Sequence, residues 1–235
     1  MKNLVVFTGA GVSAESGLKT FRDTDGLWEE YNVMDVATPE AWEADKELVL
    51  NFYNKRRRQI LEAKPNEAHT WIAALEKKYL VTVITQNIDD LHERAGSSHV
   101  LHLHGNITYG RSTNPDDEKL YPIKGSELSL GDTCANGFQM RPHVVWFGED
   151  VPNMPIAQDI IKKSEILIVC GTSLTVYPAA GLVFHAHYKC KKYLIDPNDI
   201  RLADIENISI IKEKASIGMK ILAEKLLSSH SVNDL

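Results

Sequence analysis

Short apolar runs rich in Val and Ile recur along the chain, each bounded by Gly, Thr or Asn. Their residues do not alternate between apolar and polar types, a pattern typical of strands that are buried on both faces of a parallel sheet. The runs occupy residues 4–7, 81–84, 100–103, 166–170, 193–195 and 208–211.

Helical patterns separate these runs, at residues 14–18, 45–62, 66–78, 88–95, 157–163, 179–188 and 215–227. Strands that alternate with helices predict a doubly wound α/β sheet. Two segments do not fit the alternation. Residues 21–64 contain helix but no convincing strand, and residues 106–140 are polar and rich in Gly, Asp, Ser and Pro. Since ordered domains rarely contain such long loops, we expect both segments to leave the sheet and form a smaller module.

The composition is that of an ordinary soluble globular protein. The chain has 235 residues, 43% hydrophobic and 25% charged, which suits one large domain or one domain with an insertion. Its net charge of −6 argues against nucleic acid or an anionic membrane as the main partner. The apolar start at residues 4–7 is too short for a secretory signal, and no stretch approaches a membrane span. The scattered cysteines, Cys134, Cys170 and Cys190, predict a reducing, cytoplasmic location.

The first apolar run leads directly into residues 9–14, Gly-Ala-Gly-Val-Ser-Ala, which open a helical pattern. Glycines allow a tight turn and a close approach of backbone N–H groups to a pyrophosphate, and a helix N-terminus adds positive potential. We expect Ser13 to cap this helix, and Ser16 and Gly17 to end it early. The alternative is a plain joint between a strand and a helix.

A standard dinucleotide site also has an acidic residue at the end of a second strand, ~20 residues further on. Glu29, Glu30 and Asp35 fall in that range, but no strand pattern precedes them. We therefore expect a nucleotide site of a different build, in which residues 17–28 fold over the ligand.

Three more polar turns directly follow predicted strands. They are residues 85–89 (Thr-Gln-Asn-Ile-Asp), 171–173 (Gly-Thr-Ser) and 196–198 (Asp-Pro-Asn). Ligands bind at the carboxyl ends of the strands in an open parallel sheet, so these turns and the glycine motif converge on one edge. Taken singly, each is an ordinary turn; taken together, they favour a binding site.

Five motifs stand in order along the chain: residues 9–17 (Gly-Ala-Gly-Val-Ser-Ala-Glu-Ser-Gly), 20–22 (Thr-Phe-Arg), 86–89 (Gln-Asn-Ile-Asp), 102–105 (His-Leu-His-Gly) and 171–173 (Gly-Thr-Ser). They closely resemble the signatures of the sirtuins, over nearly the whole chain except residues 106–140. Sirtuins are NAD-dependent protein lysine deacylases with a Rossmann-like large domain and a small domain formed by two insertions. The resemblance implies an NAD-binding large domain at residues 1–20, 65–105 and 141–235, a helical part of the small domain at 21–64, and a degenerate zinc module at 106–140.

In the mechanism that this resemblance implies, the amide oxygen of an acyl-lysine attacks the anomeric carbon of NAD as nicotinamide leaves. A histidine then removes a proton from the ribose hydroxyls, and the products are free lysine, nicotinamide and O-acyl-ADP-ribose. His104, in a His-Gly dipeptide after a strand, matches this histidine, and imidazole titrates in the range that such a base needs. We expect His102, two residues earlier, and His92, His99 and His143 to be structural.

Asn87 and Asp89 match the family residues that position the nicotinamide and the ribose in catalysis. Either side chain could instead cap the helix that begins at Ile88. Phe21 and Arg22 resemble a flap over the nicotinamide. The full set of NAD contacts implied by the resemblance is Gly9, Ala10, Gly11, Ser13, Glu15, Thr20, Phe21, Arg22, Trp28, Gln86, Asn87, Ile88, Asp89, Gly171, Thr172, Ser173, Asp196 and Ala215.

Tyr53 and Arg56 are spaced i, i+3 in a helical pattern, so they share one helix face. A phenol and a guanidinium aimed into an apolar tunnel would bind a terminal carboxylate. The pair resembles the signature of class III sirtuins, which remove succinyl, malonyl or glutaryl groups, and Ala37 matches the small residue that widens their pocket. The alternative is that residues 55–58, Lys-Arg-Arg-Arg, form a solvated helix face.

Residues 144–148, Val-Val-Trp-Phe-Gly, resemble the family segment that pairs with the substrate peptide as an added strand, opposite the loop at 174–177. Taken by pattern alone, residues 144–147 are a core strand, and the two interpretations are compatible. The resemblance implies substrate contacts at Val145, Trp146, Phe147, Gly148 and Tyr177.

Most sirtuins hold a structural zinc ion with four cysteines. Between His104 and Arg141 this chain has Cys134 alone, and Ser112 stands where the first ligand is expected. We therefore expect no zinc, and a module held by the packing of Tyr109, Leu120, Tyr121, Ile123, Leu128, Leu130 and Phe138.

The sequence thus predicts an NAD-consuming lysine deacylase that acts on acyl-lysine proteins or peptides and removes succinyl or malonyl groups, and also acetyl. One alternative is an ADP-ribosyltransferase or NAD glycohydrolase on the same fold, which Tyr53 and Arg56 disfavour. A second is a non-catalytic sensor of NAD or ADP-ribose, which His104, Asn87 and Asp89 disfavour.

Overall fold

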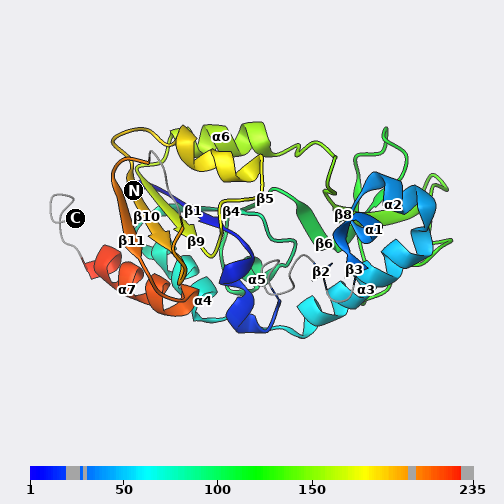
Figure 1. The fold of residues 1–235 in the computed structure, drawn as a ribbon, viewed down its shortest axis with the longest axis horizontal. Helices are drawn as coiled ribbons and strands as arrows, with labels where there is room; N and C mark the ends of the chain where they lie inside the picture. The colour runs from blue at the N-terminus through cyan, green and yellow to red at the C-terminus, as the bar shows by residue number, and fades with distance from the viewer. Residues whose placement is uncertain (20–26, 29–30, 201–204, 229–235) are drawn as a thin grey trace.

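A six-stranded parallel sheet forms the larger part of the molecule, in a computed structural model that describes residues 1–19, 27–28, 31–200 and 205–228. The strand order is β11-β10-β9-β1-β4-β5, and each neighbouring pair is parallel. The predicted doubly wound α/β sheet is therefore confirmed (Figure 1). The strands coincide with the apolar runs: β1 (Asn3–Thr8), β4 (Leu80–Thr85), β5 (Val100–His102), β9 (Ile166–Cys170), β10 (Lys191–Ile195) and β11 (Ile208–Ile211).

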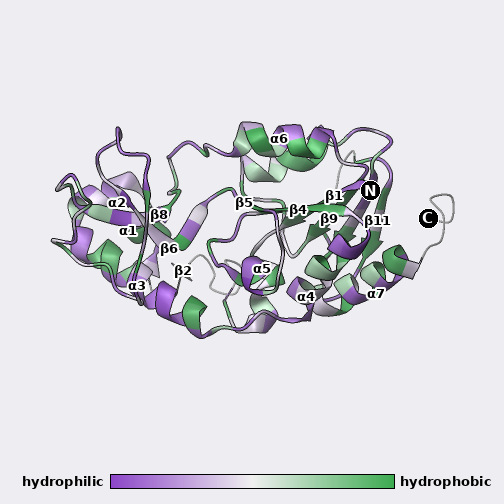
Figure 2. Cartoon of the chain, turned by 180° about the vertical axis from the view of Figure 1, so that it is seen from behind, coloured by the Kyte–Doolittle hydropathy of each residue, from purple (hydrophilic) through white to green (hydrophobic). Residues whose placement is uncertain are grey.

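Helices cover both faces of this sheet, which explains why its strands are apolar throughout. Successive side chains of a strand point to opposite faces. Leu4 and Val6 pack in one cluster with α4 (Glu67–Ala74) and α7 (Ala215–Ser228). Val5 and Phe7 pack on the other face, with α6 (Met154–Lys162) and the 3₁₀ helix η4 (Ala179–His185). The strands are predominantly hydrophobic in Figure 2, whereas the covering helices carry both kinds of residue.

Several predicted helices are shorter than expected or of another type. Residues 14–18 form no α-helix. Two short 3₁₀ turns follow β1 instead, η1 (Ala10–Val12) and η2 (Ala14–Ser16), and Gly17 ends the second with a φ of 86°. The helix predicted from Ile88 is α5 (Leu91–Arg94), which starts later because Asp89 Oδ1 accepts a hydrogen bond from Leu91 N. Residues 66–78 divide into α4 and the 3₁₀ turn η3 (Leu75–Lys77).

A smaller module with its own apolar core lies at the opposite end of the long axis (Figure 1). Its helices α1 (Val33–Val36), α2 (Pro39–Ala44) and α3 (Lys46–Glu62) share this core with an antiparallel sheet of order β7-β6-β8. The sheet consists of β6 (Gly105–Ser112), β7 (Leu120–Pro122) and β8 (Met140–Val144). Where the sequence indicates no strand, the short strands β2 (Leu27–Trp28) and β3 (Tyr31–Asn32) pair. The exact domain limits remain a prediction.

Buried polar side chains of α3 hold the loops of this module. Arg57 is fully buried and donates from Nε to Ile107 O at 2.7 Å and from Nη1 to Ser126 O at 2.9 Å. Asn54, one helical turn earlier, donates to Leu128 O and accepts from Leu128 N, both at 3.0 Å. These bonds satisfy backbone groups that would otherwise be buried without partners.

The expectation that apolar packing alone holds residues 106–140 is wrong in part. Leu128 is buried, but Leu120, Leu130 and Phe138 are exposed. Gln139 closes the loop instead: its Oε1 accepts from Gly131 N at 2.8 Å, and its Nε2 donates to several carbonyl oxygens of the same loop. Because one polar side chain satisfies the loop backbone, the apolar side chains are free to point outward.

No helix in the described part of the chain is both long and apolar enough to cross a membrane.

Arg57→Leu should lower the free energy of unfolding by about 2 kcal/mol or more, because it leaves buried carbonyl groups without donors. The adjacent Arg58 is the matched control: it is exposed and pairs with Glu127 at 3.4 Å, so Arg58→Leu should cost less than about 0.5 kcal/mol. Urea denaturation of both variants measures the difference, and equal losses would contradict the role of Arg57.

Candidate active site

Two glycine turns meet at the carboxyl edge of the sheet, one after β1 and one after β9. Gly11 N donates to Gly171 O at 2.8 Å, and a Cβ atom at Gly11 would lie 2.8 Å from Gly171 Cα. Gly171 has a φ of 64°, and a Cβ atom there would lie 2.3 Å from Val12 N. Backbone packed directly on backbone leaves no room for a side chain. Glycine is therefore required at both positions by the protein itself.

Ser13 does not cap a helix as predicted, because its hydroxyl is the centre of a buried hydrogen-bond cluster. Its Oγ donates to Asp89 Oδ2 at 3.0 Å and accepts from Asn87 Nδ2 at 3.2 Å. His69 Nε2 approaches the same oxygen at 3.4 Å. Since His69 Nδ1 accepts from Asn66 N at 3.2 Å, its proton lies on Nε2 and is donated to Ser13. The cluster thus fixes the directions of the Asn87 amide and the Asp89 carboxyl.

Burial shapes the protonation of this cluster. It raises the pKa of the Asp89 carboxyl, although the hydrogen bonds from Leu91 N and Ser13 act in the opposite direction. It lowers the pKa of His69 to about 4, so this ring is neutral at pH 7. A neutral His69 is the form that can accept from Asn66 and donate to Ser13 at once.

His104 follows β5 and lies beside the turn that carries Asn87 and Asp89. Its Nδ1 lies 3.0 Å from Gln86 O, and a carbonyl oxygen only accepts, so Nδ1 carries a proton. Burial lowers the pKa of His104, while the bond to Gln86 works against that shift. The imidazole is therefore neutral at pH 7, with its lone pair on Nε2. This is the form of histidine that acts as a general base.

Hydrogen bonds tie the neighbouring turns together at the same edge. Gln86 Nε2 donates to Thr172 Oγ1 at 3.0 Å, and Gly171 N donates to Ile195 O at 3.0 Å. Glu15 accepts from both the backbone and the hydroxyl of Ser216, next to Ala215 at the start of α7. The ends of β1, β4, β9 and β10 therefore form one continuous polar rim.

The predicted acyl-binding residues lie together in the core of the small module. Tyr53 and Arg56 are both buried in its apolar core, together with Ala37 and Trp146. The Tyr53 hydroxyl has no hydrogen-bond partner among the described residues. Burial raises the pKa of Tyr53, whereas the neighbouring Trp146 side chain and the charges of Arg141 and Arg56 lower it by less, so the phenol stays neutral and can donate.

The alternative of a solvated arginine face is wrong for Arg56 and Arg57, which are buried, and holds for the exposed Arg58. The reason lies in the tertiary packing of α3. One side of this helix faces both the apolar core and the loops after β6, and long cationic side chains on that side become enclosed.

Residues 145–147 run between His104 and the core of the small module. Val145 N donates to His104 O at 2.9 Å, and Phe147 N donates to Ala37 O at 3.0 Å. Between them, the indole of Trp146 is buried and its centroid lies 3.2 Å from the guanidinium carbon of Arg141. The prediction of a strand over 144–147 is wrong beyond Val144, because these N–H groups bind carbonyl groups outside any strand.

Residues 106–140, where the family resemblance places a zinc module, offer too few ligands for a tetrahedral site. Cys134 Sγ donates to Ser112 Oγ at 3.5 Å. Ser112 stands where the family resemblance places the first zinc ligand. Among the residues that the structure describes, no group of three or more His, Cys, Asp or Glu side chains could hold a metal ion. The residues present do not fit four-coordinate zinc.

A family model described as the Sir2 family matches residues 9–178 of this chain. The chain belongs to the Sir2 family. A protein of Bacteroides thetaiotaomicron named NAD-dependent protein deacylase is 49% identical over 231 residues, covering 97% of this chain and 99% of that protein. A Helicobacter pylori protein of the same name is 50% identical, covering 98% of this chain and all of its own length.

Solved structures of Sir2 proteins have the same fold. The crystal structure of a Sir2 homolog–NAD complex superposes with a TM-score of 0.87 at 38% identity, covering 97% of this chain and 90% of that one. A Sir2 variant with a deacetylated p53 peptide and 3′-O-acetyl ADP-ribose superposes with a TM-score of 0.80 at 32% identity, covering 94% and 92%.

The site in this Sir2-family chain brings together most of the predicted residues from the ends of β1, β4, β5 and β9. Thr20, Phe21 and Arg22 lie outside the described residues, as does the side chain of Trp28. Two residues at the start of α4 were not predicted from the sequence: His69, which contacts Ser13, and the N-cap residue Asn66, which orients His69. The Asn-x-x-His spacing is a capping-box pattern, but no local signal points it toward the site.

Acid should destabilise this Sir2-family protein through His69. Its pKa is about 4 in the folded state and 6.5 as a free group, so the unfolded state binds more protons between these values. Stability is therefore lost as the pH falls from 6.5 towards 4, by up to about 1.4 kcal/mol per pH unit for each such histidine.

His69→Gln, which keeps a donor for Ser13, should reduce this slope. Urea denaturation between pH 7 and 4.5 measures it, with the exposed His99→Gln as control. An unchanged slope in His69→Gln would refute the assignment.

Proposed function

We propose that this Sir2-family protein is an NAD-dependent protein lysine deacylase that prefers acidic acyl groups. The observation that carries the proposal is the neutral imidazole of His104, whose tautomer is fixed by Gln86 O. Gln86 directly precedes Asn87 of the Ser13–Asn87–Asp89 cluster, and the His104 carbonyl accepts from Val145 N, whose neighbour Trp146 packs in the same core as Tyr53. A base between a ribose site and an acyl-lysine site is what this chemistry requires.

NAD, when bound, supplies an anomeric carbon that accepts the acyl amide oxygen as nicotinamide departs. His104 Nε2 takes a proton from the ribose hydroxyls, so that the acyl group can migrate to the ribose. The bond to Gln86 O keeps the proton on Nδ1 and so directs the lone pair of Nε2 into the site. As the ring becomes charged, the same bond stabilises it.

Asn87 and Asp89 serve as the positioning groups for the nicotinamide and the ribose. Ser13 holds both, because it accepts from the Asn87 amide and donates to the Asp89 carboxyl. The donors already bound to Asp89 keep its oxygens in one place, so the site is ordered before NAD arrives.

The remaining NAD contacts follow the polar rim from β1 to β10. The adenosine and phosphate groups would lie along Gly9, Ala10, Gly11, Glu15, Asp196 and Ala215. The nicotinamide ribose and its phosphate would lie near Thr20, Phe21, Arg22, Trp28, Gln86, Ile88, Gly171, Thr172 and Ser173.

The acyl pocket supports a preference for succinyl and malonyl groups. Arg56 carries a permanent positive charge, and the neutral Tyr53 hydroxyl donates, so both groups favour a carboxylate. The surrounding core is apolar, and the small side chain of Ala37 would leave room for a longer chain than acetyl. An acetyl group is small enough to enter as well.

The acyl-lysine peptide would lie along residues 145–148. Phe147 and Tyr177 are both exposed large side chains, which suits contact with a bound peptide. Val145, Trp146 and Gly148 would form the wall of the lysine tunnel and the adjoining backbone edge.

Incubation with NAD and matched acetyl- and succinyl-lysine peptides tests the reaction. Mass spectrometry should detect deacylated peptide with O-acyl-ADP-ribose. Release of nicotinamide without peptide would instead indicate a glycohydrolase or ADP-ribosyltransferase, and binding without turnover would indicate a sensor.

His104→Ala should reduce kcat by about a hundredfold or more, the usual contribution of a general base, and leave NAD affinity largely unchanged. Calorimetry with NAD and the peptide assay measure the two effects, with His99→Ala as control. Wild-type turnover in His104→Ala would exclude His104 as the base.

Arg56→Met should lower kcat/KM for the succinyl peptide by about 10- to 100-fold, the loss expected for a charge-assisted bond, and affect the acetyl peptide far less. Arg58→Met, two residues further on and exposed, is the matched control. Equal losses on the two peptides would defeat the carboxylate hypothesis without affecting the deacylase assignment.

A further inference from the structure

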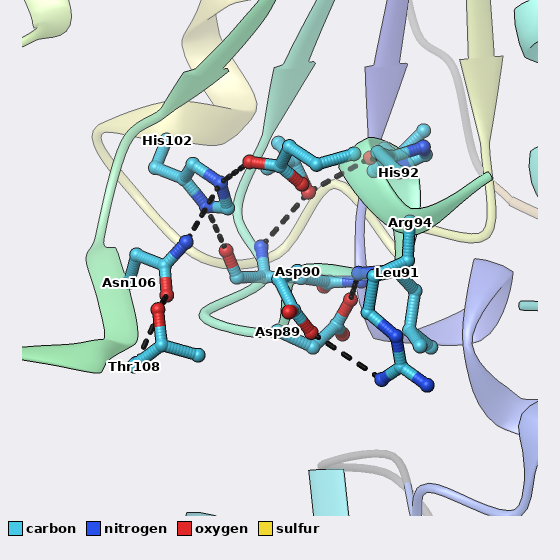
Figure 3. A network of polar contacts seen from close by, with 12 residues as sticks. Asp89, Asp90, Leu91, His92, Arg94, His102, Asn106 and Thr108 are labelled. Carbon is cyan, nitrogen blue, oxygen red and sulfur yellow. Dashed lines mark hydrogen bonds and ion pairs between the residues drawn. The ribbon is translucent and has the colours of Figure 1, made fainter. Parts of the chain in front are cut away.

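A second histidine, His102, lies at the end of β5 and contacts an acceptor with each ring nitrogen (Figure 3). Its Nδ1 lies 2.9 Å from Asn87 O, and its Nε2 lies 2.7 Å from Glu93 Oε1. A carbonyl oxygen and a carboxylate both accept, so both nitrogens must carry protons. Asn106 Nδ2 also approaches Nε2, at 3.5 Å, but Glu93 Oε1 at 2.7 Å is much the shorter contact and decides that Nε2 carries a proton.

The surroundings favour this charged form. Burial alone would lower the pKa of His102, but the Glu93 carboxylate, the Asn87 carbonyl and the charge of Asp89 together raise it above its usual value. The pKa of Glu93 is lowered: burial would raise it, but the bond to His102 outweighs that effect. Two other histidines feel the charge of His102, since it lowers the pKa of both His92 and His143.

His102 and His104 act on neighbouring peptide groups of the same turn. Consecutive carbonyl groups from Thr85 to Ile88 all accept hydrogen bonds from residues 102–107. The donors are Leu103 N to Thr85 O at 2.9 Å, His104 Nδ1 to Gln86 O at 3.0 Å, His102 Nδ1 to Asn87 O at 2.9 Å, and Ile107 N to Ile88 O at 2.9 Å. Two imidazoles thus replace backbone donors in the middle of this row.

This row fixes the peptide that carries the Asn87 side chain. Asn87 N donates to Thr85 Oγ1 at 3.0 Å, and its amide donates to Ser13, so His102 supplies the remaining backbone bond of that residue. Without His102, Asn87 O would lose its donor and the peptide between Asn87 and Ile88 would be free to turn. The Asn87 side chain is attached directly next to this peptide, and the Gln86 carbonyl that orients His104 belongs to the peptide just before it.

We propose that His102, held by Glu93, is a positioning residue for the nicotinamide end of the site, acting through the Asn87 peptide on Asn87 and His104. This inference rests on the proposed deacylase function. It assigns to His102 a part in the reaction that its position on the strand alone does not indicate. Glu93 is the second element of the device, because it keeps His102 doubly protonated.

His102→Leu tests the inference against the matched control His99→Leu, which changes an exposed histidine just before the same strand. His102→Leu should lower kcat/KM for NAD by about 10- to 100-fold, the scale of a small misplacement of reacting groups, while the KM for peptide changes less than about twofold. His102→Gln, which retains one donor, should recover part of the loss.

Glu93→Gln provides a second test that does not require His102 to be removed. It keeps a hydrogen-bond acceptor but removes the charge, so the pKa of His102 should fall. The alkaline limb of kcat/KM for NAD should then move to lower pH, while the acid limb is unchanged. Nitrogen NMR of the imidazoles should show His102 still protonated above pH 6.5 in the wild type, and losing that proton earlier in Glu93→Gln.

This inference alone would be overturned if the wild-type protein is active and His102→Leu matches His99→Leu in kcat and KM. A thermal shift in His102→Leu without any change in kcat/KM for NAD, or a neutral His102 at pH 6.5, would also overturn it. A wild-type protein that consumes no NAD with any acyl peptide would overturn the proposed function, and the inference with it.

Discussion

The parallel pairing of β1 with both β4 and β9 is the constraint on which the rest of this molecule depends. The register places Thr8, the last residue of β1, beside Thr85 on one side and Cys170 on the other. All three strands therefore end at one level, and the three turns that follow must share one small space. Only glycine at positions 11 and 171 lets two of these turns touch, backbone to backbone.

Once the turns meet, electrostatics assigns a different state to each nearby histidine. His69 is buried and His104 partly buried, both beside donors and acceptors that suit a neutral ring, and their pKa values fall. His102 is also partly buried, but a carboxylate reaches it from α5 and its pKa rises. The same type of side chain is thus a neutral donor to Ser13 at His69, a neutral ring with its lone pair on Nε2 at His104, and a cation at His102. The cause in each case is the set of neighbouring partners.

Hydrogen bonds from a few polar side chains hold the loops of the small module. Arg57 and Asn54 bind the loops from the helix side, and Gln139 binds them from within. A buried guanidinium is costly unless its N–H groups find acceptors, and here backbone carbonyl groups provide them. The loops are therefore held through α3, the helix that also carries Tyr53 and Arg56. The structure of the loops and the placement of Tyr53 and Arg56 therefore depend on the same helix.

The sequence by itself determined the parallel sheet, since uninterrupted Val- and Ile-rich runs can be buried only between two helical layers. It also determined which turns meet at the carboxyl edge, because parallel strands end on one side. The local sequence pattern predicted the wrong structure at residues 14–18 and the wrong role for Ser13. The Ser13 hydroxyl suits a helix cap but instead binds Asp89, which is distant in the chain. Tertiary structure alone decided that Arg56 and Arg57 are buried while Arg58 is not, that His69 supports the site from α4, and that His102 is charged while His104 is neutral. These properties depend on burial and on partners distant in the sequence, and the spacing of residues along the chain does not predict either.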